Sequence, residues 1–159
     1  HNEPNCLLRS CIPGHITASG FVVDKNKTKL VLIHHKKIGK WIQVGGHADG
    51  NPDLLSVALK EAREETGIEV IHPITLKGYK QAIPFDIDIH QIPSFGNDPK
   101  HLHFDVRFLL MSKETKLIRN HESNAIRWVN LDQTTKFSDC SSLYRMTRRF
   151  KTLINHLNN

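Results

Sequence analysis

The sequence predicts an α+β fold, in which a mixed β-sheet lies between helices. Strand-like segments precede and follow one helix with clear end signals, and an amphipathic helix closes the chain. An order of strands, helix, strands and helix is typical of layered folds with helices packed on a sheet. The 159 residues are enough for one domain over residues 1–159 with a buried core, and we expect residues 1–12 to be a lead-in segment.

The predicted strands are runs of β-branched and other apolar residues bounded by polar turns. Two of them, at residues 85–90 and 101–111, alternate with a period of two, which places successive side chains on opposite faces of a sheet. In chain order we predict strands over residues 15–23, 29–35, a short piece of 38–46, 70–76, 85–90, 101–111 and 125–131.

The first predicted helix lies between Asn51 and Gly67. Asn51 is a favourable N-cap, Pro52 suits the first helical position, and Gly67 suits the position just past the last turn. The closing helix is predicted over residues 141–157, because its apolar residues recur at helical spacing. These residues are Leu143, Met146, Phe150, Ile154 and Leu157.

Three glutamates, Glu61, Glu64 and Glu65, crowd the end of the first helix. Acids are disfavoured there by the partial negative charge of the helix C-terminus, and Glu61 and Glu65 are spaced to repel each other by about 0.2–0.5 kcal/mol. On a helical wheel they form an arc beside the apolar packing face, which consists of Leu55, Ala58, Leu59 and Ala62. A hard divalent cation would compensate the three carboxylates, so they are candidate metal ligands.

The segment from Gly46 to Ile68 resembles the signature of the Nudix family, G-x5-E-x7-R-E-U-x-E-E-x-G-U, where U is a bulky aliphatic residue. The three glutamates stand in register, and a match of this length is far more specific than a short glycine motif. Pro52 and Lys60 depart from the pattern, because family members commonly have Glu and Arg there, paired in a supporting salt bridge. We hypothesise that Asp53 pairs with Lys60 instead.

The resemblance covers most of the chain and implies a Nudix-type α/β/α sandwich with a mixed central β-sheet. It also implies hydrolysis of a nucleoside diphosphate linked to another moiety, with Mg²⁺ or Mn²⁺ as cofactor. Glu61, Glu64 and Glu65 would then be both metal ligands and catalytic residues. Such ions neutralise a pyrophosphate and orient an attacking water.

Other predicted site residues lie outside the glutamate arc. Glu122 stands six residues before Trp128, a spacing that resembles the extra catalytic glutamate of some family members, and a surface glutamate is the alternative. Gly45, Gly46 and His47, which precede the helix, are expected to bind substrate.

Histidines are frequent, with eleven in the chain. His101, His103 and Asp105 alternate, so they project from one face of a strand, and His15 and His47 are further candidates. Two imidazoles and a carboxylate on one face suit either a transition metal or a substrate phosphate or base. We predict contact with substrate phosphate or base, with metal ligation as the alternative.

Two other functions stay open. Type I isopentenyl diphosphate isomerases share the Nudix fold and hold a metal with histidines, and Gly45-Gly46-His47 resembles their C-G-H segment with Gly in place of the catalytic Cys. A non-catalytic Nudix module for ligand sensing or RNA binding is the other alternative. It usually lacks one or more of the glutamates, all of which are present here.

The composition of the chain favours some kinds of binding partner and cellular location over others. The net charge of +6 suits an anionic small molecule, but the basic residues are scattered and form no evident nucleic-acid stripe. No apolar run approaches the roughly 18 residues of a membrane span. Three cysteines without a CxxC pair argue against a disulfide framework, so we expect a reducing, cytoplasmic location. Residues 77–101 are the expected specificity loop, and a homodimer is one expectation because dimers occur in the family.

Overall fold

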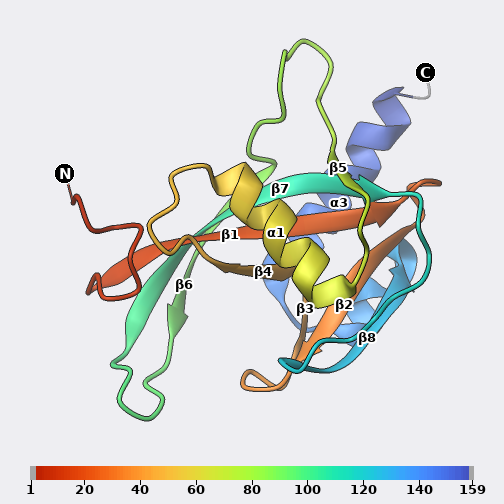
Figure 1. Ribbon diagram of the computed structural model, residues 1–159. Helices are drawn as coiled ribbons and strands as arrows, with labels where there is room; N and C mark the ends of the chain where they lie inside the picture. The colour runs from red at the N-terminus through yellow and green to blue at the C-terminus, as the bar shows by residue number, and fades with distance from the viewer. Residues whose placement is uncertain (1–2, 158–159) are drawn as a thin grey trace.

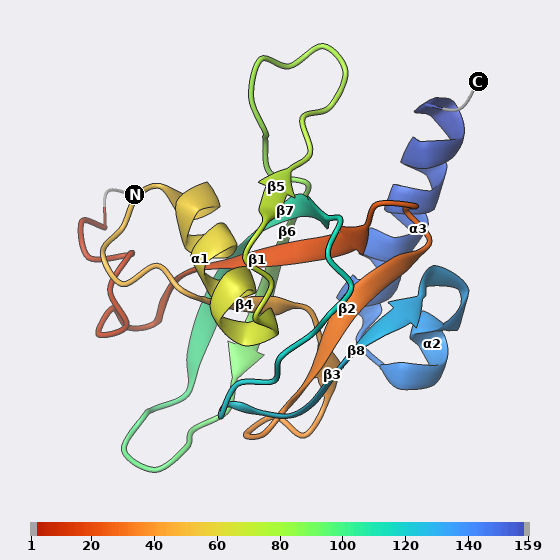
Figure 2. The ribbon, with the colours of Figure 1, turned by 45° about the vertical axis from the view of Figure 1, so that its right-hand side comes forward.

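The fold is a mixed β-sheet with a helix packed on each face (Figure 1, Figure 2). The computed structural model describes residues 3–157. Helix α1 (Leu54–Thr66) covers one face and α3 (Ser141–Leu157) covers the other, while a 3-10 turn (Leu131–Gln133) and α2 (Thr134–Phe137) precede α3. The strands are β1 (Gly14–Asp24), β2 (Lys29–His35), β3 (Trp41–Ile42), β4 (Val44–His47), β5 (Ile71–Pro73), β6 (Asp86–Ile92), β7 (His101–Ser112) and β8 (Ser123–Asn130).

The centre of the sheet is a long parallel pair. Strands β1 and β7 run in unbroken register from the pair Gly14–Leu102 to the pair Asp24–Ser112. Strand β4 joins β1 and strand β6 joins β7, both antiparallel, while β2, β8 and β3 continue the sheet beyond the far end of β1. Segments far apart in the sequence are therefore neighbours across β6, β7, β1 and β4, and these four strands hold most of the site described below.

Alternation along β1 divides the core into two layers. Ala18 and Val22 face α1, where they belong to a buried cluster with Ala58 and Ala62. Phe21 and Val23 face α3 and pack in a second cluster, whose members from α3 are Leu143, Met146 and Phe150. Burial of apolar surface on both faces is the main stabilising contribution, worth roughly 25 cal/mol per Å². The predicted mixed sheet between helices is confirmed.

The start of α1 differs from the prediction. Asp53 is the N-cap and its carboxylate accepts the backbone N–H of Ser56, so the helix begins at Leu54. Asn51 and Pro52 lie before the helix, where the Asn51 side chain accepts the N–H of Asp53. An anionic cap is favoured because it also meets the positive end of the helix dipole, which explains why Asp53 displaces the predicted cap. Gly67 ends the helix in the left-handed conformation, as predicted.

The packing face of α1 also needs one correction. Ala58 and Ala62 are fully buried as predicted, but Val57 is buried too, whereas Leu55 and Leu59 are only partly buried. The short helix α2 was not predicted, because four residues are too few for a helical period. All three cysteines are free, as expected. Among the helices in residues 3–157, none has both the length and the hydropathy to cross a membrane.

Candidate active site

The glutamates of α1 form a graded series from the interior to solvent. Glu65 is 2% exposed, and its carboxylate accepts the backbone N–H of Gly45 at 2.8 Å. Glu61 is partly buried, and Glu64 is largely exposed, with 55% of its side chain accessible. The bond from Gly45 joins the last turns of α1 to β4, so the helix and the glycine pair form one unit.

The glycine pair is required by close approach rather than by flexibility. A Cβ atom on residue 46 would lie 2.5 Å from the carboxyl carbon of Glu61, and a Cβ on residue 45 would lie 2.3 Å from the hydroxyl oxygen of Ser19. A side chain at residue 45 would also clash with the backbone of β1, and one at residue 46 would displace the Glu61 carboxylate from its place against β4. Gly45 and Gly46 therefore let the carboxylates of α1 sit directly against the backbone of β4.

Electrostatics at this edge of α1 favours a cation. Burial is the main cause that raises the pKa of Glu65 to about 8; the Gly45 N–H opposes this shift, and the charges of Glu61 and Glu122 add to it. Burial likewise raises the pKa of Glu61, while Lys60 opposes the shift. Carboxyl groups with raised pKa values lack a full complement of positive charge, which a divalent cation would supply.

Glu122 lies close enough to the α1 carboxylates for its charge to act on them. It precedes β8, its backbone carbonyl accepts the N–H of Lys36, and more than half of its side chain is exposed. Its charge raises the pKa values of both Glu61 and Glu65, so the structure brings this distant glutamate within electrostatic range of the α1 carboxylates. The glutamates predicted to be catalytic thus come from two separate segments, and their catalytic role stays a prediction.

Lys60 does not pair with Asp53, and that hypothesis is wrong. The Lys60 ammonium contacts Glu64 at 2.9 Å and Glu61 at 3.4 Å, whereas Asp53 is used to cap the helix. The i,i+4 geometry favours Glu64 over a residue two turns away. Lys60 therefore shields two of the three glutamates at the helix surface.

Replacing Lys60 by Ala is expected to change the free energy of unfolding by no more than about 1 kcal/mol, because exposed ion pairs contribute little. Lys60 is 62% exposed, which supports the small value. Urea unfolding of Lys60→Ala measures it, with exposed Lys113→Ala as the matched control. A variant that no longer folds would contradict this view of Lys60 as a surface partner.

The predicted histidines gather on the other face of the sheet. His15 and His103 are directly paired across β1 and β7, and both follow the alternation that faces α3. The ring centroid of His15 lies 4.9 Å from the centroids of His101 and His103 and 5.1 Å from the centroid of His47. His90 of β6 adjoins His103, with ring centroids 5.5 Å apart. Together these residues line one end of the sheet.

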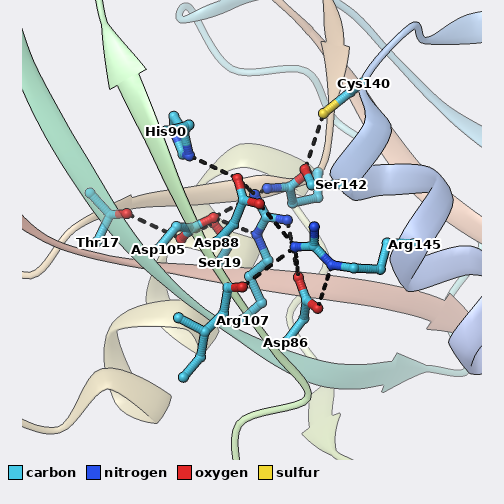
Figure 3. A network of polar contacts seen from close by, with 12 residues as sticks. Thr17, Ser19, Asp86, Asp88, His90, Asp105, Arg107, Cys140, Ser142 and Arg145 are labelled. Atoms are coloured by element: carbon cyan, nitrogen blue, oxygen red, sulfur yellow. Dashed lines mark hydrogen bonds and ion pairs between the residues drawn. The ribbon is translucent and has the colours of Figure 1, made fainter.

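Asp105, predicted to act with these histidines, is instead the centre of a buried polar network (Figure 3). It is 2% exposed, and its carboxylate accepts hydrogen bonds from the hydroxyls of Thr17 and Ser19 and from Arg107, the last at 2.6 Å. A fourth, longer bond comes from Gln43. These donors occupy the carboxylate, so Asp105 orients β1 against β7 and does not face a ligand.

Arg107 extends the network to two further strands and to α3. Its guanidinium contacts Asp86 and Asp88 of β6, and Arg145 of α3 contacts the same two carboxylates. Figure 3 shows the two guanidinium groups converging on this acidic pair. Asp86, Asp88, Arg107 and Arg145 were not predicted as a group. The available signal was the alternation in Asp86-x-Asp88 and Asp105-x-Arg107, which places charges on one sheet face.

The comparisons with known proteins agree with this geometry. A family model described as the NUDIX domain matches residues 14–150. An asymmetrical bis(5'-nucleosyl)-tetraphosphatase of Rattus norvegicus is 28% identical over 107 residues, which cover 67% of this chain and 63% of that protein. The chain thus matches just under two thirds of the length of this curated relative.

Solved structures show the same fold at lower identity. A NUDIX-family hydrolase from Clostridium perfringens has a TM-score of 0.66 at 21% identity, with 87% of this chain and 97% of that chain covered. An Ap4A hydrolase of C. elegans, in a binary complex, has a TM-score of 0.60 at 16% identity, with 89% and 98% covered. Because the family model spans most of the chain and the fold agrees, this protein belongs to the Nudix family.

Proposed function

We propose that this Nudix protein is a metal-dependent hydrolase that cleaves the pyrophosphate linkage of a nucleoside diphosphate joined to another moiety. The observation that carries the proposal is the row of Glu61, Glu64 and Glu65 along one edge of α1, with Glu65 bonded to Gly45 and Glu61 beside Gly46. A buried carboxyl with its pKa raised to about 8 is costly to keep ionised without a cation close to it.

The donor set fits Mg²⁺ or Mn²⁺. All three side chains offer carboxylate oxygens, which are the ligands that hard divalent cations prefer, and the exposed Glu64 leaves the site open to solvent and substrate. Glu61, Glu64 and Glu65 would hold the ion. When bound, it would neutralise the pyrophosphate and lower the pKa of an attacking water.

The protein's own groups have distinct roles in this proposal. Gly46 has no side chain to obstruct substrate phosphates that approach the Glu61 carboxylate, and Gly45 lets β4 lie close to β1. The exposed Glu122 is our candidate to accept the proton of the attacking water, since a general base needs solvent access and an ionised carboxylate. His47 follows the glycine pair on β4 and is our candidate substrate contact.

The relatives suggest where a substrate search should begin. Because the rat and nematode proteins are named for bis(5'-nucleosyl) tetraphosphates, we place these dinucleotides first in a panel. Nucleotide sugars, ADP-ribose, oxidised nucleotides and coenzyme A complete it. We further propose that residues 1–159 form one catalytic domain that acts without nucleic acid. Specificity would reside in residues 77–101, where Tyr79 and Phe95 are exposed.

The proposal is tested by hydrolysis of this panel with Mg²⁺, Mn²⁺ or excess EDTA. We expect release of a nucleoside phosphate from at least one compound, only with metal, and incorporation of ¹⁸O from labelled water into a phosphate product. Folded protein that hydrolyses no member of the panel with either metal would contradict the proposal. So would turnover that survives EDTA.

An isomerase-like activity is the second candidate, because the histidine cluster supports it. Against it, Gly45 occupies the place of the catalytic cysteine, and Cys6, Cys11 and Cys140 lie in other segments. Incubation with isopentenyl diphosphate decides between the two. Conversion to dimethylallyl diphosphate without phosphate release would favour the isomerase, and no conversion would favour the hydrolase.

A further inference from the structure

We propose that His15, His101 and His103 form a second metal site, specific for a transition metal such as Zn²⁺ and separate from the glutamates of α1. One ring nitrogen from each residue lies within 4.8 Å of the others. The Nε2 atoms of His101 and His103 are 3.2 Å apart. Nitrogen ligands of one tetrahedral Zn²⁺ at about 2.0–2.1 Å stand about 3.3–3.4 Å from each other, so this pair already has the required spacing.

His15 supplies the independent sign of a missing ligand. It is 2% exposed, and neither ring nitrogen has a hydrogen-bond partner among the described residues. The backbone of Cys11 approaches the ring closely enough to influence its pKa, but without hydrogen-bond geometry. Leaving a buried polar group unpaired destabilises a fold. The His15 ring lies against those of His101 and His103. A shared cation satisfies this unpartnered ring.

A hydrogen bond prepares His101 for the same role. Its Nδ1 atom lies 2.8 Å from the carbonyl oxygen of Pro99. A carbonyl only accepts, so Nδ1 carries the ring proton and Nε2 of the neutral ring presents a lone pair toward His103. Histidines that bind metals in proteins are commonly oriented by such a bond from the second nitrogen to a backbone carbonyl.

The ligand type distinguishes this site from the carboxylate site. Neutral imidazoles suit Zn²⁺, Fe²⁺ and similar ions, whereas Mg²⁺ prefers oxygen. Asp105 cannot join as a ligand because Thr17, Ser19 and Arg107 occupy its carboxylate. Three nitrogen ligands leave a fourth position for water or an anionic group. This assignment replaces substrate contact as our preferred role for His101 and His103.

The site is tested by the metal content of tag-free protein, stripped with chelator, incubated with one equivalent of Zn²⁺ or Co²⁺ and dialysed. We expect one equivalent to remain in the wild type and in a Glu64→Gln/Glu65→Gln variant, and Co²⁺ to give the visible absorption bands of tetrahedral coordination. His101→Ala and His103→Ala should bind the metal at least about 100-fold more weakly, since loss of a residue that only orients a ligand already costs roughly 10–100-fold.

The controls make either outcome decisive. His72→Ala, an exposed histidine of β5 outside the cluster, should retain the metal. Circular dichroism shows whether each variant is folded, and His15→Gln is the conservative change at the buried position. The Co²⁺ spectrum of the wild-type protein tests the site even if a variant does not fold. The proposed site is wrong if the wild-type protein retains no stoichiometric transition metal. It is also wrong if the glutamate variant loses the metal while the folded histidine variants keep it. None of these readouts depends on hydrolysis, so the proposed function is tested separately.

Discussion

Glu65→Gln is expected to lower metal-dependent hydrolysis by on the order of 10²–10³-fold, the scale of losing one electrostatic stabiliser of a transition state. The amide keeps an oxygen that can accept the Gly45 N–H, so α1 should remain attached to β4. It removes the negative charge that a cation needs. Because the native carboxyl is buried with a raised pKa, we expect the free energy of unfolding to be little changed or slightly increased.

The measurement is kcat/KM with saturating Mg²⁺ on the best substrate of the panel, together with a thermal melt. Glu64→Gln should show the same loss of activity, although its side chain is exposed. Glu69→Gln, just beyond the helix and also exposed, is the matched control and should be fully active. Wild-type turnover by either variant in α1 would remove that residue from the proposed metal site.

Arg107→Met is expected to destabilise the fold by roughly 3–5 kcal/mol, because removing one partner of a buried ion pair leaves an uncompensated charge. Asp86 and Asp88 would still contact Arg145, but Asp105 would lose its only cationic partner in the described structure. Since Asp105 links β1 to β7, we expect the parallel centre of the sheet to be the part most affected.

Urea unfolding measures this change, and Arg148→Met on the exposed face of α3 is the matched control. The double variant Asp105→Leu/Arg107→Met should be less destabilised than the sum of the two single variants, because replacing both partners leaves no unpaired charge. Additive effects would show that the two side chains are not coupled, contrary to the observed contact.

The same network predicts the direction of acid sensitivity. Burial alone would raise the pKa of Asp88, but the hydrogen bond from Arg145 and the charge of Arg107 outweigh it and lower the pKa. A lowered folded-state pKa means that stability is complete above the unfolded value near 3.9 and is lost as pH falls through the folded one. We therefore expect the free energy of unfolding to fall less steeply with decreasing pH in Arg145→Met than in the wild type. Urea unfolding of both proteins across this pH range measures the difference.

The sequence alone was sufficient for the local features of this protein. Strand β2 and helix α3 have the predicted bounds, because their patterns of apolar residues depend only on the strand or helix period. The Nudix resemblance was also readable, since Glu61, Glu64 and Glu65 lie within one helix whose spacing determines their common face. The N-cap of α1 was misplaced, because Asn51 and Asp53 are both good caps and their competition depends on the surrounding loop.

The tertiary structure alone decided which distant residues meet. Period-two alternation shows that His103 and Asp105 share a sheet face, but not that parallel pairing sets them beside His15 and Thr17 of β1. The pairing of β1 with β7 joins residues far apart in the sequence, and it gives His103 and Asp105 different neighbours. His103 lies in a cluster with His15, which has no hydrogen-bond partner among the described residues, while Asp105 is surrounded by hydrogen-bond donors. Burial of Glu65 likewise depends on the approach of β4, which no helical period encodes.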